Sequence, residues 1–160
     1  MDDSLKSYQG NLQQNQSILQ NNLGKTYFQD SSLGPELFES IAASSIDGIF
    51  VFDKDYCCLY ANPAAAGYIP NTIKTAAGWT LFDLLSDSAP YIRCWIDEIE
   101  RVFQTSKRRV KTNTLSIHNQ SVFIESVFSP VLNAGGELTA VSLVLRDLTD
   151  RMRMEQLLAD

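Results

Sequence analysis

Three strand-like segments separated by two short turns lie near the C-terminal end, and they restrict the fold more than any other feature of the sequence. The first turn is His118-Asn119-Gln120, and the second is the Gly-rich run at residues 133–137. Turns of this length join antiparallel neighbours, so segments 109–117, 121–131 and 138–146 are predicted to form a meander. Both faces of the last segment are apolar, which predicts a central strand covered on at least one side.

A second pair of strands is predicted earlier in the chain. Residues 49–52 and 57–61 are strand-like and flank the turn signal Asp53-Lys54-Asp55, so they predict a hairpin. Asn62-Pro63 follows the second strand directly. Asn is a favoured N-cap and Pro is favoured at the first helical position, so a short helix is expected to begin there.

The longest predicted helix covers residues 88–106. Its apolar face consists of six side chains at helical spacing: Ile92, Trp95, Ile96, Ile99, Val102 and Phe103. Cys94 lies on the polar side and is therefore expected to be exposed. Shorter helical segments are predicted at 35–44 and 81–85. Together these elements predict an α+β fold, a five-stranded antiparallel sheet with helices on one face.

The first 34 residues differ from the rest in composition. They are rich in Asn and Gln, which is typical of a flexible leader or a solvated helix. Three leucines recur there at heptad spacing: Leu5, Leu12 and Leu19. A helix that pairs with a second copy is therefore the alternative. The chain divides into this leader at 1–34, a folded domain at 35–148 and the start of a C-terminal helix at 149–160.

Charge and hydropathy restrict the partners and the location. The formal net charge is −6, and nucleic acid and anionic membranes both require a positive field, so neither is an expected partner. One basic cluster is present: Lys107, Arg108, Arg109 and Lys111. We interpret it as interacting favourably with the dipole of the preceding helix, with phosphate binding as the alternative. No stretch reaches the roughly 20 apolar residues of a membrane span, and no signal peptide is evident, which predicts a cytoplasmic protein.

Cysteine and histidine offer little chemistry in this sequence. The cysteines are odd in number, and Cys57 and Cys58 are strand neighbours that point to opposite faces, so reduced thiols are expected. The only histidine, His118, falls in a predicted turn. We interpret it as a solvated residue rather than a metal ligand or a general base.

Five short motifs occur in a characteristic order and spacing. They are Ser45-Ile46-Asp47-Gly48-Ile49, Tyr60-Ala61-Asn62-Pro63-Ala64, Gly78-Trp79, Phe128-Ser129-Pro130-Val131 and Arg146-Asp147-Leu148-Thr149-Asp150-Arg151. From Leu37 to its C-terminal end, the sequence resembles the PAS domains of bacterial signalling proteins. The resemblance implies a homodimer whose last strand leads into a signalling helix, and an effector beyond it such as a histidine kinase, a partner kinase or a cyclase.

The start of that helix is the expected site of signal output. By the resemblance, Asp147 and Thr149 lie where the last strand leaves the sheet, and either side chain can cap the helix. A short apolar stripe follows: Met154, Leu157 and Leu158. An inert terminal helix packed on its own domain is the alternative.

The resemblance also implies a ligand pocket between the sheet and the long helix. Its candidate residues, by resemblance and strand alternation, are Tyr60, Tyr68, Trp79, Phe82, Trp95, Ile99, Thr112, Thr114 and Glu125. The alternative is that these residues simply close the core. Haem-binding members supply a histidine from the long helix, and flavin photosensors carry a cysteine in the stretch that corresponds to 78–85. Both are missing here, so neither haem nor covalent flavin is expected, and the identity of a small-molecule ligand stays open.

The function predicted from these observations is a sensory and dimerisation module rather than an enzyme. The first alternative is a PAS scaffold that binds no ligand and only holds two chains together. The second is a small enzyme of a similar curved-sheet fold, with Glu125 and either Tyr60 or Tyr68 as its acid–base pair. Glu125 lies between Phe123 and Val127 on one strand face, where a buried carboxylate would need a partner.

Overall fold

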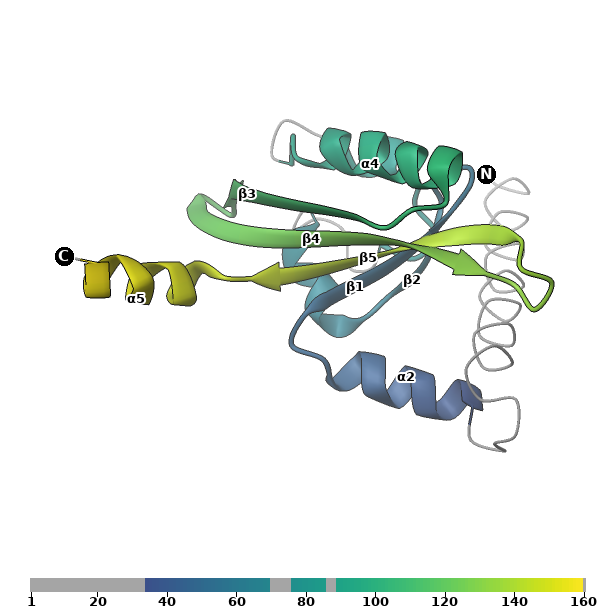
Figure 1. Ribbon diagram of the computed structural model, residues 1–160, viewed down its shortest axis with the longest axis horizontal. Helices are drawn as coiled ribbons and strands as arrows, with labels where there is room; N and C mark the ends of the chain where they lie inside the picture. Colours follow the sequence, from purple (N-terminus) through teal and green to yellow (C-terminus); the bar gives the residue numbers. More distant parts are fainter. Residues whose placement is uncertain (1–33, 70–75, 86–88, 160) are drawn as a thin grey trace, which may run out of the picture.

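A five-stranded antiparallel sheet forms the centre of the protein (Figure 1). The computed structural model describes residues 34–69, 76–85 and 89–159. The strands are β1 (Gly48–Asp53), β2 (Cys58–Ala61), β3 (Arg109–Ile117), β4 (Gln120–Leu132) and β5 (Leu138–Asp147). Their order in the sheet is β2-β1-β5-β4-β3, so β5 is the middle strand, as predicted from its two apolar faces. The leader leucines Leu5, Leu12 and Leu19 lie outside the described residues.

The helices occupy both sides of this sheet. They are α2 (Gly34–Ser44), the 3₁₀ helix η1 (Pro63–Tyr68), α3 (Leu81–Leu84), α4 (Ile92–Thr105) and α5 (Thr149–Ala159). The long helix α4 covers one face, α2 lies across the other, and α5 extends beyond the end of the sheet (Figure 1). The predicted α+β fold is confirmed, and the position of α2 is the feature that the sequence did not predict.

Tight turns fix the register of the strands. His118 and Asn119 both have positive φ angles, 50° and 64°, which suits a two-residue hairpin turn whose twist matches that of the strands. At the next turn, the side-chain oxygen of Asn133 accepts hydrogen bonds of 2.9 Å from the backbone N–H groups of Gly135 and Glu137. Both predicted turns are confirmed, and His118 lies exposed in the first of them.

Large apolar side chains fill the space between α4 and the sheet. Fully buried residues on this face include Phe50, Phe52, Phe128, Leu143 and Leu145. The Phe50 ring lies 5.7 Å from the Phe52 ring and 5.5 Å from that of Trp95 on α4, measured between centroids. Burying a side chain of this size contributes about 1.5–3 kcal/mol to folding. Among the described residues, these side chains fill the centre of the layer between α4 and the sheet.

Asn62 joins three elements on the N-terminal side of the domain. Its side chain is 3% exposed, and its oxygen accepts hydrogen bonds from the N–H groups of Ile49 and Ala65 at 2.9 and 3.0 Å. Its amide nitrogen donates to the carbonyl groups of Ala42 and Asp47, both at 2.9 Å. The predicted N-cap is confirmed, and the same side chain also ties α2 to β1.

Glycine is required where η1 passes beneath β1. A Cβ atom placed on Gly48 would lie 2.9 Å from the Tyr68 ring, closer than real Cβ contacts allow. The ring of Tyr68 therefore packs directly on the backbone of β1, and any larger residue at position 48 would displace it.

Candidate functional site

A half-open cavity of about 230 Å³ lies between the first turns of α4 and the strands β3 and β4. We call it the edge cavity, and its lining consists of Tyr91, Cys94, Trp95, Lys111, Asn113, Thr114, Leu115, Ser126 and Phe128. Trp95 and Phe128 belong to the buried core and form its inner wall. The edge cavity thus lies at the side of the layer between α4 and the sheet, directly beside the packed core.

Ser126 is a buried polar group on the wall of this cavity. The residue is only 6% exposed, and its hydroxyl makes no hydrogen bond to any residue that the structure describes. Among those residues, every fully enclosed side-chain nitrogen and oxygen has a partner. The small exposed part of Ser126 therefore includes its hydroxyl oxygen, and this oxygen faces the cavity.

Glu98 lies beside the edge cavity on α4 and is 2% exposed. Its carboxylate contacts Arg101 and Lys111 at 3.6 Å each and accepts a short hydrogen bond from Arg109. Burial on its own raises the pKa of Glu98, but the bond from Arg109 and the charges of the three cations outweigh it and hold the pKa below its ordinary value. The ionised carboxylate therefore pins the edge strand β3 to α4.

Sequence reasoning missed Glu98 because it is one charge among many on α4. A signal was nevertheless present: Glu98 is three residues after Trp95 and four before Val102, so it falls inside the apolar stripe of the helix. A carboxylate in such a stripe needs cationic partners, and the basic residues of β3 supply them.

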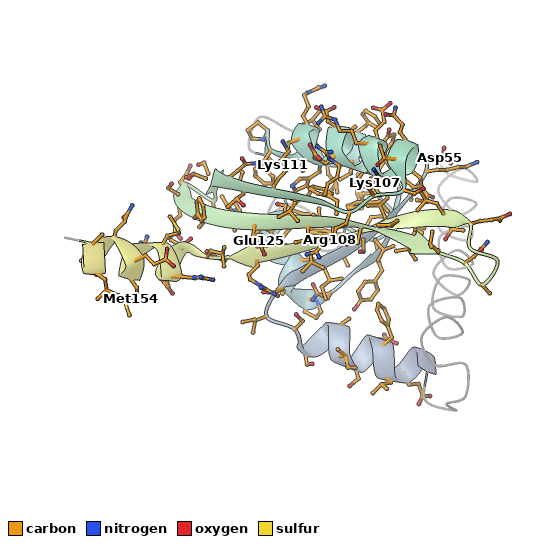
Figure 2. All side chains as sticks on the ribbon, viewed as in Figure 1. Asp55, Lys107, Arg108, Lys111, Glu125 and Met154 are labelled. Carbon is orange, nitrogen blue, oxygen red and sulfur yellow. The ribbon has the colours of Figure 1, made fainter. Side chains whose placement is uncertain are left out.

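Two interpretations of this region are wrong. Arg109 and Lys111 pair with Glu98 rather than with the dipole of α4, although Lys107 and Arg108 do remain exposed near the end of the helix (Figure 2). Cys94 is half-buried against β3 rather than exposed, because β3 covers that side of the helix. Burial and the nearby Glu98 carboxylate raise the pKa of Cys94, so its thiol is a poor nucleophile at neutral pH.

The junction between β5 and α5 is held by side chains of both elements. The Asp147 carboxylate accepts a 2.8 Å hydrogen bond from the Thr149 N–H and a second bond from the Thr149 hydroxyl. The Thr149 hydroxyl in turn accepts a 2.9 Å bond from the N–H of Phe123 on β4. Asp147 therefore caps the helix, whereas Thr149 clamps its first turn to the neighbouring strand.

Beyond this clamp, α5 has no buried residue. Its apolar stripe is largely exposed, with Met154 at 64%, Leu157 at 74% and Leu158 at 87%. Figure 2 shows Met154 projecting away from the helix. An ion pair between Arg151 and Glu155, at 3.1 Å, supports the helix on its polar side. The stripe is therefore free to contact another molecule.

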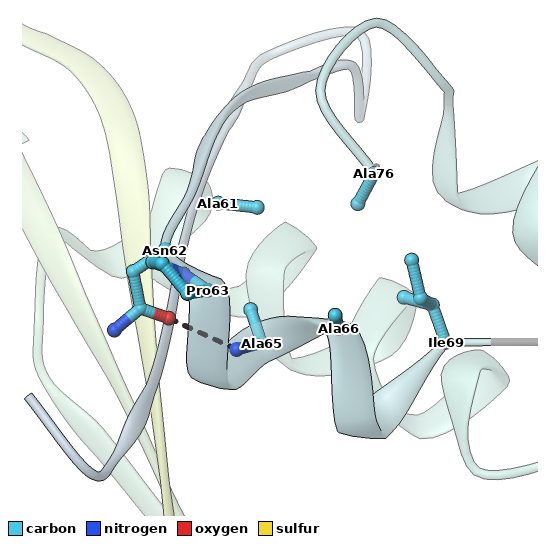
Figure 3. Close-up of a pocket in the computed structure, with 7 residues that line it drawn as sticks. All are labelled: Ala61, Asn62, Pro63, Ala65, Ala66, Ile69 and Ala76. Atoms are coloured by element: carbon cyan, nitrogen blue, oxygen red, sulfur yellow. Dashed lines mark hydrogen bonds between the residues drawn. The ribbon is translucent and has the colours of Figure 1, made fainter. Parts of the chain in front are cut away.

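A second, smaller cavity lies near the start of η1 (Figure 3). It measures about 180 Å³ and is lined by Ala61, Asn62, Pro63, Ala65, Ala66, Ile69 and Ala76. The side chain of Asn62 has two donor hydrogens and two acceptor lone pairs, and its four hydrogen bonds already use them. The other lining side chains are apolar, so this cavity offers no side-chain group to orient a polar ligand.

Five of the nine predicted pocket residues lie on or near the α4 side of the sheet. Trp95 and Ile99 are buried in the core, and Tyr68 is half-buried there. Trp79 and Phe82 are exposed on the segment around α3, and the Phe82 ring packs edge-on against Tyr56 at 5.4 Å.

Four predicted pocket residues lie on the opposite face, so their predicted orientation is wrong. Tyr60 packs against Phe38 of α2 with ring centroids 5.7 Å apart. Glu125 and Thr112 are cross-strand neighbours on that same outer face, and Thr114 shares it although it borders the edge cavity. The reason is the phase of β4, whose alternate residues Ile124, Ser126 and Phe128 take the inner face. Glu125 and Tyr60 are three strands apart in the sheet order, about 14 Å, and Tyr68 is on the inner face, so the proposed acid–base pair does not form.

Neither a metal-binding cluster nor a membrane-spanning helix occurs among the described residues. In that part of the chain, no three histidine, cysteine or acidic residues come together in a group that could hold a metal ion. None of its helices has the length and apolar character needed to cross a membrane.

Three features together define a class of protein, the PAS fold. They are the strand order, the helix α4 over one face and the helix that leaves the middle strand. A family model described as PAS fold matches residues 42–153, and the chain belongs to this family. The class expected from the sequence motifs is thereby confirmed. Among curated protein sequences, none matches this chain.

Solved structures show the same fold at low sequence identity. Phage VqmA in complex with DPO has a TM-score of 0.65 and 16% identity, covering 78% of this chain and 57% of that chain. The PAS domain of BvgS from Bordetella pertussis has a TM-score of 0.62 and 20% identity, covering 78% of this chain and 93% of that chain. This chain therefore spans little more than half of the phage VqmA chain but nearly all of the BvgS domain.

A third structure corrects an expectation about partners. The complex of VqmA from Vibrio cholerae with a ligand and DNA has a TM-score of 0.62 and 17% identity, covering 72% of this chain and 51% of that chain. The fold thus occurs in a protein that binds DNA. The prediction that nucleic acid is not a partner is wrong, because the net charge of one domain describes neither a local patch nor the rest of a longer protein.

Proposed function

We propose that this chain is a sensory and dimerisation module that passes a signal through α5 to an effector. The observation that carries the proposal is the junction at Asp147 and Thr149, where the helix is fixed to both β5 and β4 while its apolar stripe stays exposed. A helix held this firmly at one end and uncovered along its length is suited to pairing with a second copy.

The resemblance to signalling proteins implies a histidine kinase or a cyclase as the effector. The Vibrio cholerae VqmA complex adds a DNA-binding effector as a further candidate. The exposed α5 suits each of them, because a pair of helices can transmit a change of angle or register to whatever domain follows.

The ligand-free scaffold is the second candidate function, and a specific observation favours it. Phe50, Phe52 and Trp95 fill the centre of the layer beneath α4, where a large ligand would otherwise lie. The edge cavity favours the sensory function instead, since the Ser126 hydroxyl on its wall makes no hydrogen bond to any residue that the structure describes. Native mass spectrometry of the purified chain distinguishes them, because a sensor isolated with its ligand shows a discrete extra mass and a scaffold does not.

Dimerisation through α5 can be tested by light scattering on the full chain. Replacing Met154 and Leu157 with Glu places charges on the apolar stripe, and we expect the double variant to be monomeric where the parent chain is dimeric. Gln156→Glu, on the same helix but outside the stripe, is the matched control and should leave the mass unchanged. A double variant that stays as dimeric as the control would refute pairing through α5.

A further inference from the structure

We infer that the edge cavity binds a small planar molecule that carries one anionic oxygen group, held by Lys111 and Ser126. The inference rests on the proposed sensory function and specifies the class of its ligand. It follows from the size of the cavity, the chemistry of its walls and the charges beside it.

The size of the cavity suits a single aromatic ring with one substituent. An engineered protein cavity of about 150 Å³ holds benzene, and the edge cavity measures about 230 Å³. Its apolar walls come from Tyr91, Trp95, Leu115 and Phe128. Aromatic walls favour a flat molecule, because stacked or edge-on ring contacts add to the apolar surface that is buried.

Polar groups on the wall fix how such a molecule would be oriented. The Ser126 hydroxyl faces the cavity from within the core and makes no hydrogen bond to any described residue. Its oxygen belongs to the small exposed part of this residue, so water or a ligand atom in the cavity can satisfy it. Asn113, at the exposed rim on β3, supplies an amide that can donate a further hydrogen bond.

The charge at the cavity mouth favours an anion. Lys111 lines the cavity, and its ammonium nitrogen lies 3.6 Å from Glu98. Glu98 already pairs with Arg101 and Arg109, so three cations surround one carboxylate. The surplus positive charge lets Lys111 bind a second carboxylate while Arg109 keeps Glu98 neutralised.

Benzoate is the probe that tests this inference, with two matched comparison molecules. Benzyl alcohol keeps the ring but lacks the charge, and cyclohexanecarboxylate keeps the charge but is not planar. In calorimetric titrations of the full chain, we expect benzoate to bind at least about tenfold more tightly than either. No benzoate binding at millimolar concentrations, or equal binding of all three molecules, would overturn the inference.

Variants locate the binding to the edge cavity. Lys111→Met is expected to weaken benzoate binding about tenfold, and Ser126→Ala several-fold. Lys107→Met is the control, since this exposed lysine lies outside the cavity lining and its loss should change the affinity less than about twofold. Equal weakening by the Lys107 and Lys111 variants would show non-specific attraction of anions and overturn the assignment.

Two further measurements remove ambiguity. Lys111→Arg keeps the charge and should retain most of the benzoate binding. Each variant should also show the circular dichroism spectrum of the parent chain, because a misfolded variant would lose benzoate binding for an unrelated reason. Dimerisation through α5 is measured without any ligand. If the parent chain is dimeric but does not bind benzoate, the inferred ligand class is refuted and the proposed function stands.

Discussion

Glu98 shows how one residue can determine which strand lies beneath a helix. A buried carboxylate is costly unless it is paired, and its three partners come from α4 itself and from β3. Those partners are all partly exposed, so the net stability of the cluster is modest. The main effect of the cluster is to select one register of β3, because a shifted register would leave the charge of Glu98 unpaired.

Removing the Glu98 carboxylate is expected to destabilise the fold. Glu98→Ala leaves a cavity and three unbalanced cations, and we expect it to lower the free energy of unfolding by about 2–3 kcal/mol. Urea denaturation followed by circular dichroism measures the change. Asp97→Ala, at an exposed position on the same helix, is the control and should change stability by less than about 0.5 kcal/mol. Equal stability of the two variants would contradict the role assigned to Glu98.

Asn62 is expected to be the more sensitive of the two polar residues. Asn62→Ala would leave the N–H of Ile49 and the carbonyl groups of Ala42 and Asp47 without their side-chain partner. We expect a loss of about 3–5 kcal/mol, since each unsatisfied buried group costs about 1–3 kcal/mol. Thermal unfolding monitored at several wavelengths tests this, and a melting temperature within a few degrees of the parent chain would contradict it.

Among the elements, α5 depends on its first turn more than on any other contact. The Thr149 hydroxyl accepts the N–H of Phe123, and the N–H of Leu148 donates to the carbonyl of Phe123 at 2.8 Å. Both bonds join the helix to β4 rather than to β5, from which the chain arrives. The orientation of α5 is therefore set by two neighbouring strands together.

Loss of the Thr149 hydroxyl should loosen this joint without unfolding the sheet. Thr149→Val is nearly isosteric and removes the acceptor for the Phe123 N–H. We expect hydrogen exchange at Phe123 to become about tenfold faster, while amides of the middle strand β5 keep their protection. Thr139→Val, on an exposed residue at the far end of β5, is the control. Unchanged exchange at Phe123 would show that Thr149 does not hold the helix.

Elements were predictable from the sequence where their signals are local. His118-Asn119 and Asn62-Pro63 specify a turn and a helix start by their own chemistry, so the strands beside them were placed within a residue or two. The phase of β4 was not predictable, because Phe123 and Val127 on one face are as apolar as Ile124 and Phe128 on the other. The pairing of Glu98 with β3 and the face covered by α2 depend on contacts between distant segments, which local patterns do not encode.

Over the whole molecule, ionisable groups couple stability to pH in opposite directions. The pKa of Glu98 is held below its ordinary value, 4.5, so its cluster stabilises the fold fully above that pH and loses this contribution as the pH falls through the lower folded-state value. Burial raises the pKa of Asp53, so this group favours the folded state increasingly as the pH falls. The two groups therefore partly offset each other in acid.

Variants separate these two contributions. Urea unfolding of the full chain between neutral pH and pH of about 3 should show stability falling below pH of about 4.5. In Glu98→Gln that fall should be shallower, and in Asp53→Asn it should be steeper, because each variant removes one of the opposing groups. If the free energy of unfolding fell with pH in parallel for the parent chain and both variants, the opposing roles of Glu98 and Asp53 would be contradicted.

The attachment of α5 has a mechanical consequence for the whole protein. The helix has 11 residues, so it is about 16 Å long. It rises directly from the middle strand of the sheet, which pairs with β1 on one side and β4 on the other. A tilt of about 10° at its clamped base would carry its far end through about 3 Å, more than half the rise of a helical turn. Displacements too small to disturb the packing of the sheet would thus be magnified geometrically before they reach the next part of an assembly.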